Sequence, residues 1–165
     1  MAEPGRYVRP VRAPFVSIEP ARPEDVLESS STIRQADRDE CLALANMTAE
    51  TAMWRGLELS PMAWTGRVDG GIVAIFGVAP GCEATGLGIP WLVGTDALPL
   101  HALPFLRNSR GYLALMRRAY PWLQNVVDAR NTAAIRWLRW LGFHVELAVP
   151  IGPNRVPGHV FWMRG

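Results

Sequence analysis

The sequence of 165 residues predicts an α+β fold, in which helices flank a central mixed sheet that is mostly antiparallel and contains one parallel strand pair. Two observations lead to this fold class. The apolar patterns follow the order strand, helices, three strands, helix, strand, helix and two strands. A predicted helix also separates the strands expected at 88–94 and 124–128, and a parallel pair requires a helical crossover of this kind.

The N-terminal end differs in composition from the rest of the chain. Residues 1–14 contain three prolines together with Arg6, Arg9 and Arg12, a composition that does not favour a packed core. We therefore expect an extended basic arm at 1–14 and a single domain at 15–165.

The domain is expected to begin with a strand and to continue through three helices. Residues 15–20 (FVSIEP) alternate between apolar and polar side chains, as in a half-buried strand. The next segment, 21–29, opens a helix with Pro23 and two acidic residues in its first turn. The spacing of apolar residues predicts two more helices, at 34–47 and 49–59.

The middle of the chain contains the clearest hairpin signal. Two apolar runs within 63–80 flank an Asp-Gly-Gly turn at 69–71, and Asp-Gly favours the tight turns that join antiparallel strands. The apolar segment GIPWLVG (88–94) predicts a buried strand. A proline-rich connection is expected at 95–109, followed by a helix at 110–123.

The segment NTAAIRWLRWLGF (131–143) predicts a helix with a defined start and end. Asn131 is a favourable N-cap residue, and Gly142 is the residue type that most often ends a helix. Two final antiparallel strands are expected within 143–150 and 158–164, on either side of a turn rich in glycine and proline.

Charge is distributed unevenly along the chain. Residues 15–100 contain 12 acidic and 5 basic residues, whereas residues 101–140 contain seven arginines and Asp128 as the single acid. All 17 basic residues are arginine, which suits bidentate contacts with phosphates and carboxylates. The basic segment therefore indicates either a solvated helix face or an anionic partner, such as a nucleotide, a nucleic acid or an acidic protein.

The sequence argues against several classes of protein. No apolar run approaches the roughly 18 residues of a membrane span, and the N-terminus lacks the apolar core of a signal peptide. Cys41 and Cys82 fit no metal-binding spacing, so we expect no metal site and two free thiols in a reducing cytosol. These features predict a soluble intracellular protein.

The order of elements and the 131–143 segment resemble the GNAT superfamily of acyl-CoA-dependent N-acetyltransferases. Members often carry an Asn, an Ala three residues later and a Gly-Phe pair, and Asn131, Ala134, Gly142 and Phe143 match that register. The resemblance implies a GNAT-like fold in which the parallel strands are splayed, and acetyl-CoA as the cofactor.

A closer resemblance involves several segments at once. GIPWLVGTD, FLRNSRGYL and VDARNTAAIRWLRWLGF, with a final strand GHVFWMR, are similar to the GNAT-like internal virion protein A family of short-tailed phages. This resemblance implies a role in virion assembly, phage structural proteins as partners, and a location in the host cytoplasm and the virion.

The GNAT resemblance also implies a Q/R-x-x-G-x-G/A loop, whose backbone N–H groups bind the CoA pyrophosphate at a helix start. The matching segment begins with Arg107, but Arg110 and Tyr112 occupy the two positions of the small residues, where large side chains obstruct the backbone. A shifted register leaves Ser109, Arg110 and Gly111 as a partial cradle for the cofactor. An ordinary helix start with Gly111 in its first turn is the alternative.

A GNAT enzyme also needs a general acid for the departing thiolate, usually a Tyr seven residues after the helix-capping Asn. That position is Leu138, which has no proton to donate. Tyr112 and Tyr120 are the remaining candidates for the acid. Asn131 itself is expected to cap its helix and is retained as a candidate cofactor contact.

A base must take the proton from the acceptor amine, and four residues near expected strand ends have suitable side chains: Glu83, Asp96, His101 and His159. Each is also a common residue of surface turns, and Asp96 is equally suited to cap a helix. The catalytic residues therefore stay unassigned, with Glu83, Asp96 and Tyr112 as candidates.

These observations lead to three functional hypotheses. The first is a phage GNAT-fold protein with a degenerate acyl-CoA site, weak or absent catalysis, and a role in the virion or its assembly. The second is an active acetyl-CoA-dependent N-acetyltransferase that acts on a host protein or a small amine. The third, DNA binding through the arginine-rich segment, lacks any accompanying helix-turn-helix or zinc pattern.

Overall fold

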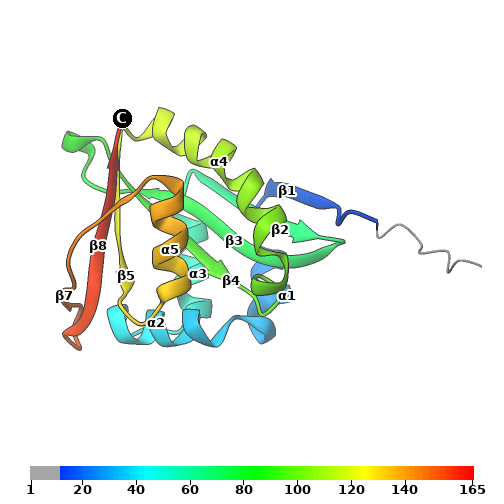
Figure 1. Ribbon diagram of the computed structural model, residues 1–165, viewed down its shortest axis with the longest axis horizontal. Helices are drawn as coiled ribbons and strands as arrows, with labels where there is room; N and C mark the ends of the chain where they lie inside the picture. Colours follow the sequence, from blue (N-terminus) through cyan, green and yellow to red (C-terminus); the bar gives the residue numbers. More distant parts are fainter. Residues whose placement is uncertain (1–11) are drawn as a thin grey trace, which may run out of the picture.

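The computed structural model describes residues 12–165, so most of the predicted basic arm at 1–14 lies outside the described residues. The described part forms one eight-stranded sheet with helices on both faces (Figure 1). In chain order the elements are β1 (Val16–Pro20), α1 (Pro23–Ser29), the 3₁₀ turn η1 (Ser30–Thr32), α2 (Gln35–Ala45), α3 (Ala49–Leu59), β2 (Met62–Val68), β3 (Gly71–Pro80), η2 (Glu83–Thr85), β4 (Leu87–Gly94), η3 (Pro99–His101), α4 (Ala102–Ala119), β5 (Trp122–Asp128), α5 (Thr132–Leu141), β6 (His144–Val145), β7 (Val149–Ile151) and β8 (Val156–Arg164). The predicted α+β class is confirmed.

The strands of the sheet follow the order β1-β2-β3-β4-β5-β8-β6, and β7 also pairs with β8. Every neighbouring pair is antiparallel except β4 and β5, which are parallel as predicted for 88–94 and 124–128. These two strands pair only at Leu87 with Trp122 and at Gly88 with Leu123. Beyond Gly88 the pair opens, so the parallel strands are splayed at one end.

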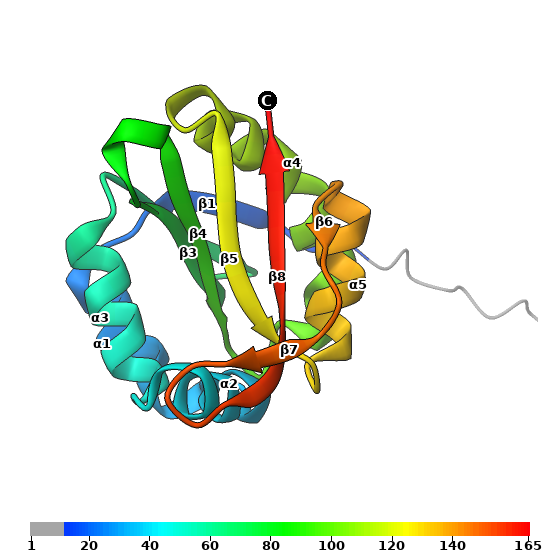
Figure 2. The same ribbon diagram turned by 90° about the vertical axis from the view of Figure 1, so that its left-hand side faces the viewer.

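Two hydrophobic cores lie on opposite faces of the sheet. Helices α1 and α3 cover one face, and α4 and α5 cover the other, with α2 at the end of the sheet between the two layers (Figure 2). Residues of β3 alternate between the cores: Phe76 and Val78 pack in the α4/α5 core, whereas Ile75 packs in the α1/α3 core. Helices therefore cover both faces. The described part contains no helix that is long and apolar enough to cross a membrane.

Local turn chemistry accounts for the boundaries that were predicted well. Asp69 and Gly70 have φ values of 49° and 89°, the left-handed backbone of the tight turn that joins β2 to β3. The Asn131 side chain accepts a hydrogen bond from the N–H of Ala134 (3.3 Å) and so caps α5. Gly142 ends that helix with a φ of 97°.

Helix α4 differs from its prediction at both ends. It begins at Ala102, whereas the sequence predicted a helix at 110–123 after a long connection, and that prediction is wrong. Pro104 lies in the first turn, where a missing N–H breaks no helical hydrogen bond, so proline is no evidence against a helix there. At the far end, Pro121 disfavours helical backbone at the preceding residue, and Trp122 already belongs to β5.

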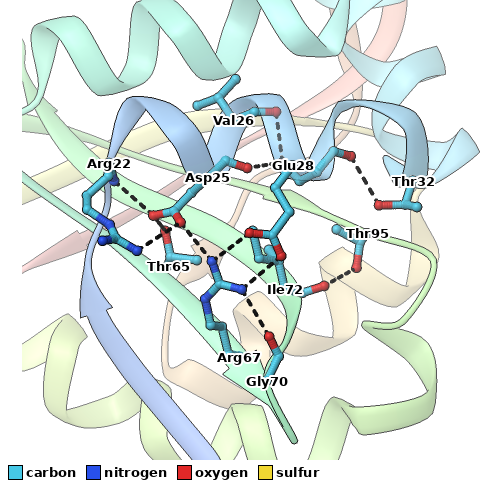
Figure 3. A network of polar contacts seen from close by, with 11 residues as sticks. Arg22, Asp25, Val26, Glu28, Thr32, Thr65, Arg67, Gly70, Ile72 and Thr95 are labelled. Carbon is cyan, nitrogen blue, oxygen red and sulfur yellow. Dashed lines mark hydrogen bonds and ion pairs between the residues drawn. The ribbon is translucent and has the colours of Figure 1, made fainter.

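A buried ion pair fastens α1 to β2 (Figure 3). The Asp25 carboxylate accepts hydrogen bonds from the backbone N–H of Arg22 (2.9 Å), the Thr65 hydroxyl (2.8 Å) and the Arg67 guanidinium (2.8 Å). Burial alone would raise the pKa of Asp25, but these donors outweigh it and hold the pKa below its usual value. Arg67 also binds Glu28, whose side chain is half exposed.

We expect Arg67→Met to destabilise the protein by about 3–5 kcal/mol, because it leaves the buried Asp25 carboxylate without its hydrogen-bonded cation and with only the exposed Arg22 guanidinium at 3.8 Å. Urea unfolding at neutral pH measures this loss. The matched control is Glu28→Gln, which removes the exposed partner of the same arginine and should cost at most about 1 kcal/mol. Equal losses of unfolding free energy for the two variants would show that the buried Asp25–Arg67 pair contributes no more to stability than the exposed Arg67–Glu28 pair.

Candidate functional site

A cavity of about 390 Å³ lies where β4 and β5 separate. This volume is within the usual range of small-molecule sites. Its strand walls come from β4, β5 and β8, namely Pro90, Trp91, Leu92, Val93, Asn125, Val126, Val127 and Phe161.

Helices from both faces of the sheet line the cavity. Phe105 of α4 and Leu138 of α5 contribute from one face, and Glu40 and Cys41 of α2 and Ala52 of α3 contribute from the other side. These helices reach the same cavity because the sheet is open between β4 and β5. Two reactants that approach from opposite faces of the sheet would therefore meet in this opening.

Side chains replace the hydrogen bonds that are lost where the parallel pair opens. The Asn125 side chain of β5 donates to the carbonyl of Pro90 in β4 (2.8 Å). The N–H of Gly94, at the end of β4, donates to the carboxylate of Asp37 (2.7 Å), which Arg34 also binds through Nε (3.1 Å). Buried backbone groups need such partners, so these contacts stabilise the opening.

Glu40 lies on the wall of this cavity together with a second carboxylate, Asp37. Its Oε1 accepts a hydrogen bond from the N–H of Asp128 (2.6 Å), and its Oε2 accepts one from Nδ2 of Asn131 (3.1 Å). Burial raises the pKa of Glu40 to about 7, and the negative charges of Asp37 and Asp128 add to the rise. Glu40 therefore exchanges a proton near neutral pH.

The neighbouring carboxylates differ from Glu40 because each has an arginine partner. Asp37 is paired with Arg34, and Asp128 is paired with Arg130 (2.6 Å). Hydrogen bonding from Arg130 holds the pKa of Asp128 below its usual value. A proton that enters this cluster is therefore held by Glu40.

Cys41 lies next to Glu40 and also lines the cavity. Burial, together with the nearby charge of Glu40, raises the pKa of its thiol to about 11. The thiolate is the nucleophilic form, so Cys41 stays unreactive at neutral pH.

One residue of the sequence-predicted set lies on the wall of this cavity. Asn131 caps α5 through its Oδ1 and donates through its Nδ2 to Glu40, so it both starts the helix and orients the carboxylate.

The predicted phosphate contacts lie inside helix α4 and away from a helix start. Ser109 is buried and donates its hydroxyl to the carbonyl of Leu106 (2.7 Å). Arg107 and Gly111 are exposed, and the Arg110 guanidinium stacks on Trp140 at 4.0 Å. Interior N–H groups of a helix are bonded to carbonyls one turn earlier, so the partial cradle expected at 109–111 has no free N–H donors.

The predicted acid and base candidates are dispersed over the fold. Glu83 is exposed in η2, and Asp96 is exposed in the turn after β4. His101 precedes α4, and His159 contacts the carbonyl of Glu146 from β8. Tyr120 ends α4 at the base of β4. None of these five side chains lines the cavity.

Tyr112, the remaining acid candidate, is part of the α4/α5 core. Its hydroxyl donates to the carbonyl of Ile18 (3.3 Å), and its ring packs edge-on against Trp64 and Phe76. The hydroxyl is therefore committed to the backbone of β1.

Sequence reasoning missed Glu40, although the sequence contained a signal for it. Asp37, Glu40, Cys41 and Leu44 recur at intervals of three and four residues, so they share one face of a helix. Acidic residues on the same face as Cys and Leu are unusual, because that face is normally buried. An acid placed there is a candidate for a shifted pKa.

The start of α4 does not form a backbone cradle for a pyrophosphate. Pro99 and Pro104 have no N–H, and the N–H of His101 is bonded to the carbonyls of Ala97 and Leu98. The chain also has no glycine between residues 94 and 111 that would let a phosphate approach closely. An anion at this helix start would find few free donors.

The cavity between β4 and β5 is suited to bind the thioester arm of a coenzyme. The start of α4 is less suited to bind the coenzyme's phosphates. Trp137 lines the cavity, and its buried indole N–H has no acceptor among the described residues. A buried donor without a partner is costly, and a carbonyl oxygen of a ligand would satisfy it. The described residues contain no group of His, Cys, Asp and Glu arranged to hold a metal ion.

The structure is similar to solved acetyltransferases, while no protein-family model and no curated protein sequence matches the chain. One similar structure is a GNAT-family acetyltransferase from Streptococcus pneumoniae (TM-score 0.61, 16% identity, 91% of this chain and 99% of that one). Others are the ribosomal-protein-S18-alanine N-acetyltransferase from Escherichia coli (0.62, 14%, 91% and 94%) and Ard1 from Thermoplasma volcanium (0.64, 15%, 90% and 97%). At such low identity these likenesses show the fold alone: the chain has a GNAT-like fold, as its sequence predicted, with the splayed strands β4 and β5 at its centre.

Proposed function

We propose that this protein transfers an acyl group from an acyl-CoA thioester, such as acetyl-CoA, to an amine, and that Glu40 is the general base. The observation that carries this proposal is the cavity in the opened β4/β5 pair, with Glu40 on its wall. The similar structures of acetyltransferases support the choice of donor.

Each wall of the opening has a part in this reaction. When bound, the thioester supplies a carbonyl carbon open to attack and a thiol that leaves, so a C–N bond forms as the C–S bond breaks. Trp137 and Leu138 of α5 would hold the thioester arm on one face. The amine would enter from the α2 side, where Glu40 takes its proton and passes it to solvent.

The second chemical role, protonation of the departing thiolate, lacks an efficient donor, because the described cavity walls carry no tyrosine and the Cys41 thiol, whose pKa burial raises to about 11, is a weak acid. Leu138 occupies the position at which the GNAT resemblance implies a tyrosine, and the Tyr112 hydroxyl is bonded to the backbone of Ile18. The absence of a general acid typically slows a reaction by about 10²–10⁴-fold. The proposed enzyme is therefore slow, with a thiolate that leaves without help from a side chain.

A second candidate function is a structural one, in which the GNAT-like fold serves a virion and the acyl-CoA site is degenerate. The prolines at the start of α4 and Leu138 favour it, and the resemblance to the internal virion protein A family supplies the context. Helices α4 and α5 carry arginines and no acidic residue, a surface suited to DNA or to acidic phage structural proteins. Its location would then be the host cytoplasm and the virion. Mass spectrometry of purified particles tests this alternative.

Calorimetric titration separates the two candidates and tests the phosphate site. We expect acetyl-CoA to bind, and acetyl-pantetheine, which lacks the phosphates, to bind within about tenfold of it, because one well-made charged contact is worth about 1.5–3 kcal/mol and the α4 start supplies none from its backbone. No heat at millimolar acetyl-CoA would favour the structural role. If acetyl-pantetheine binds a hundredfold or more weakly than acetyl-CoA, a phosphate-binding site must exist elsewhere than at the start of α4.

Glu40→Gln should lower kcat/KM for acyl transfer by about 10²–10⁴-fold, because the base is removed while the shape of the wall is kept. In the wild type, kcat/KM should rise with pH through about 7, the pKa of Glu40, since only the carboxylate accepts a proton. The variant should lose this rise. Glu58→Gln, an exposed change on α3, is the control and should keep both the rate and the profile. An unchanged profile in Glu40→Gln would remove Glu40 from the reaction.

The same carboxyl should make the folded state less stable as pH rises. The pKa of Glu40 is about 7 in the fold against 4.5 normally, so its contribution is fully present below about pH 4.5 and is lost as pH rises through 7. A shift of this size corresponds to about 3 kcal/mol between pH 5 and pH 8. Urea unfolding at both values should show a smaller difference for Glu40→Gln than for the wild type. If the unfolding free energy changes equally between the two pH values in the wild type and in Glu40→Gln, Glu40 titrates normally.

A further inference from the structure

A second cavity, of about 90 Å³, lies beside the opening on the α4/α5 face. It shares walls with the main cavity, among them Leu92 of β4, Phe105 of α4, Leu138 of α5 and Phe161 of β8. The two spaces are therefore neighbours across the same side chains.

The walls of this second cavity offer hydrocarbon contacts. Phe76, Leu113, Met116 and Phe143 close it on the sides that the main cavity does not share. The hydroxyl of Ser109 also lies on the wall, but it is bonded to the carbonyl of its own helix. The indole N–H of Trp137, which lines both cavities, is the one unpaired polar side-chain group on the described walls. A polar group elsewhere in this space would therefore lose its water without gaining a partner, whereas an alkyl chain would lose nothing.

Leu138 connects this cavity to the proposed chemistry. It is 8% exposed, it lines both cavities, and it stands where a tyrosine hydroxyl would otherwise make the wall polar. Protein interiors are normally packed without voids, because unfilled space forfeits dispersion contacts. A part of the ligand that fills this void beside the opening would therefore gain dispersion contacts.

We infer that the preferred acyl donor is a short straight-chain acyl thioester, longer than acetyl, whose alkyl tail fills the second cavity. At roughly 30 Å³ for each water-sized group, the space holds about three carbons beyond acetyl. This inference rests on the proposed acyl transfer and names its donor class.

The test compares acetyl-, butyryl- and hexanoyl-CoA by calorimetric binding and by the rate of thiol release. Each buried methylene strengthens binding about fourfold, so butyryl-CoA should bind on the order of tenfold more tightly than acetyl-CoA. At low donor concentration the rate should rise from acetyl- to butyryl-CoA and gain nothing further with hexanoyl-CoA, whose four carbons beyond acetyl exceed the cavity. Equal affinity for acetyl and butyryl donors would overturn the chain-length inference and leave acyl transfer standing. Absence of binding for all three donors would overturn both.

A pair of matched substitutions on α4 locates the tail. Leu113→Phe fills the second cavity and should abolish the preference for butyryl over acetyl, whereas Leu115→Phe makes the same change at an exposed position and should retain it. Ser109→Leu fills the cavity from one turn earlier on the same helix face and serves if Leu113→Phe fails to fold, as judged by circular dichroism. A butyryl preference that survives filling at either position would show that the tail lies elsewhere.

Discussion

The opening of the parallel pair β4/β5 is the constraint on which the rest of the structure depends. Two residue pairs hold the strands together at one end, and beyond Gly88 each strand must find other partners for its backbone groups. Side chains from distant elements supply them: Asn125 binds the carbonyl of Pro90, Asp37 binds the N–H of Gly94, and Glu40 binds the N–H of Asp128. Helix α2 thus supplies hydrogen-bond partners to both strands at their open end. The same two carboxylates, Asp37 and Glu40, form part of the cavity wall.

The carboxylates at this open end also determine where a proton is bound. Three carboxylates, Asp37, Glu40 and Asp128, meet in one corner, and two of them are paired with Arg34 and Arg130. Like charges that are brought together and removed from water favour protonation of the group with the least compensation. Glu40 is that group, because its partners are an amide and a backbone N–H and not a cation. Stability and chemistry are coupled here, since the residue best placed as a base is also the one whose ionisation opposes folding.

The apolar side of the opening has a different character. Leu138, Trp137 and the aromatic residues of β3, β4 and α4 form walls that bind by shape and dispersion, whereas the start of α4 offers little to phosphates. Recognition of a donor would then rest on its acyl and thioester parts more than on its nucleotide. Such a balance suits the proposed slow acyl transfer, with selection by the acyl group.

Local chemistry in the sequence by itself determined the α+β class, the Asp69-Gly70 hairpin, the capped helix from Asn131 to Gly142 and the parallel crossover, because turns, caps and periodicity act over a few residues. The start of α4 was missed because Pro104 is compatible with both a connection and a first helical turn, and packing of Phe105 into the core decides between them. The helical spacing of Glu40 with Asp37 and Cys41 was a local signal, but it took the tertiary structure to make Glu40 a candidate base. Burial in the fold raises its pKa, and the hydrogen bonds that hold it come from Asp128 and Asn131, about ninety residues away in the chain, a contact that no local pattern contains.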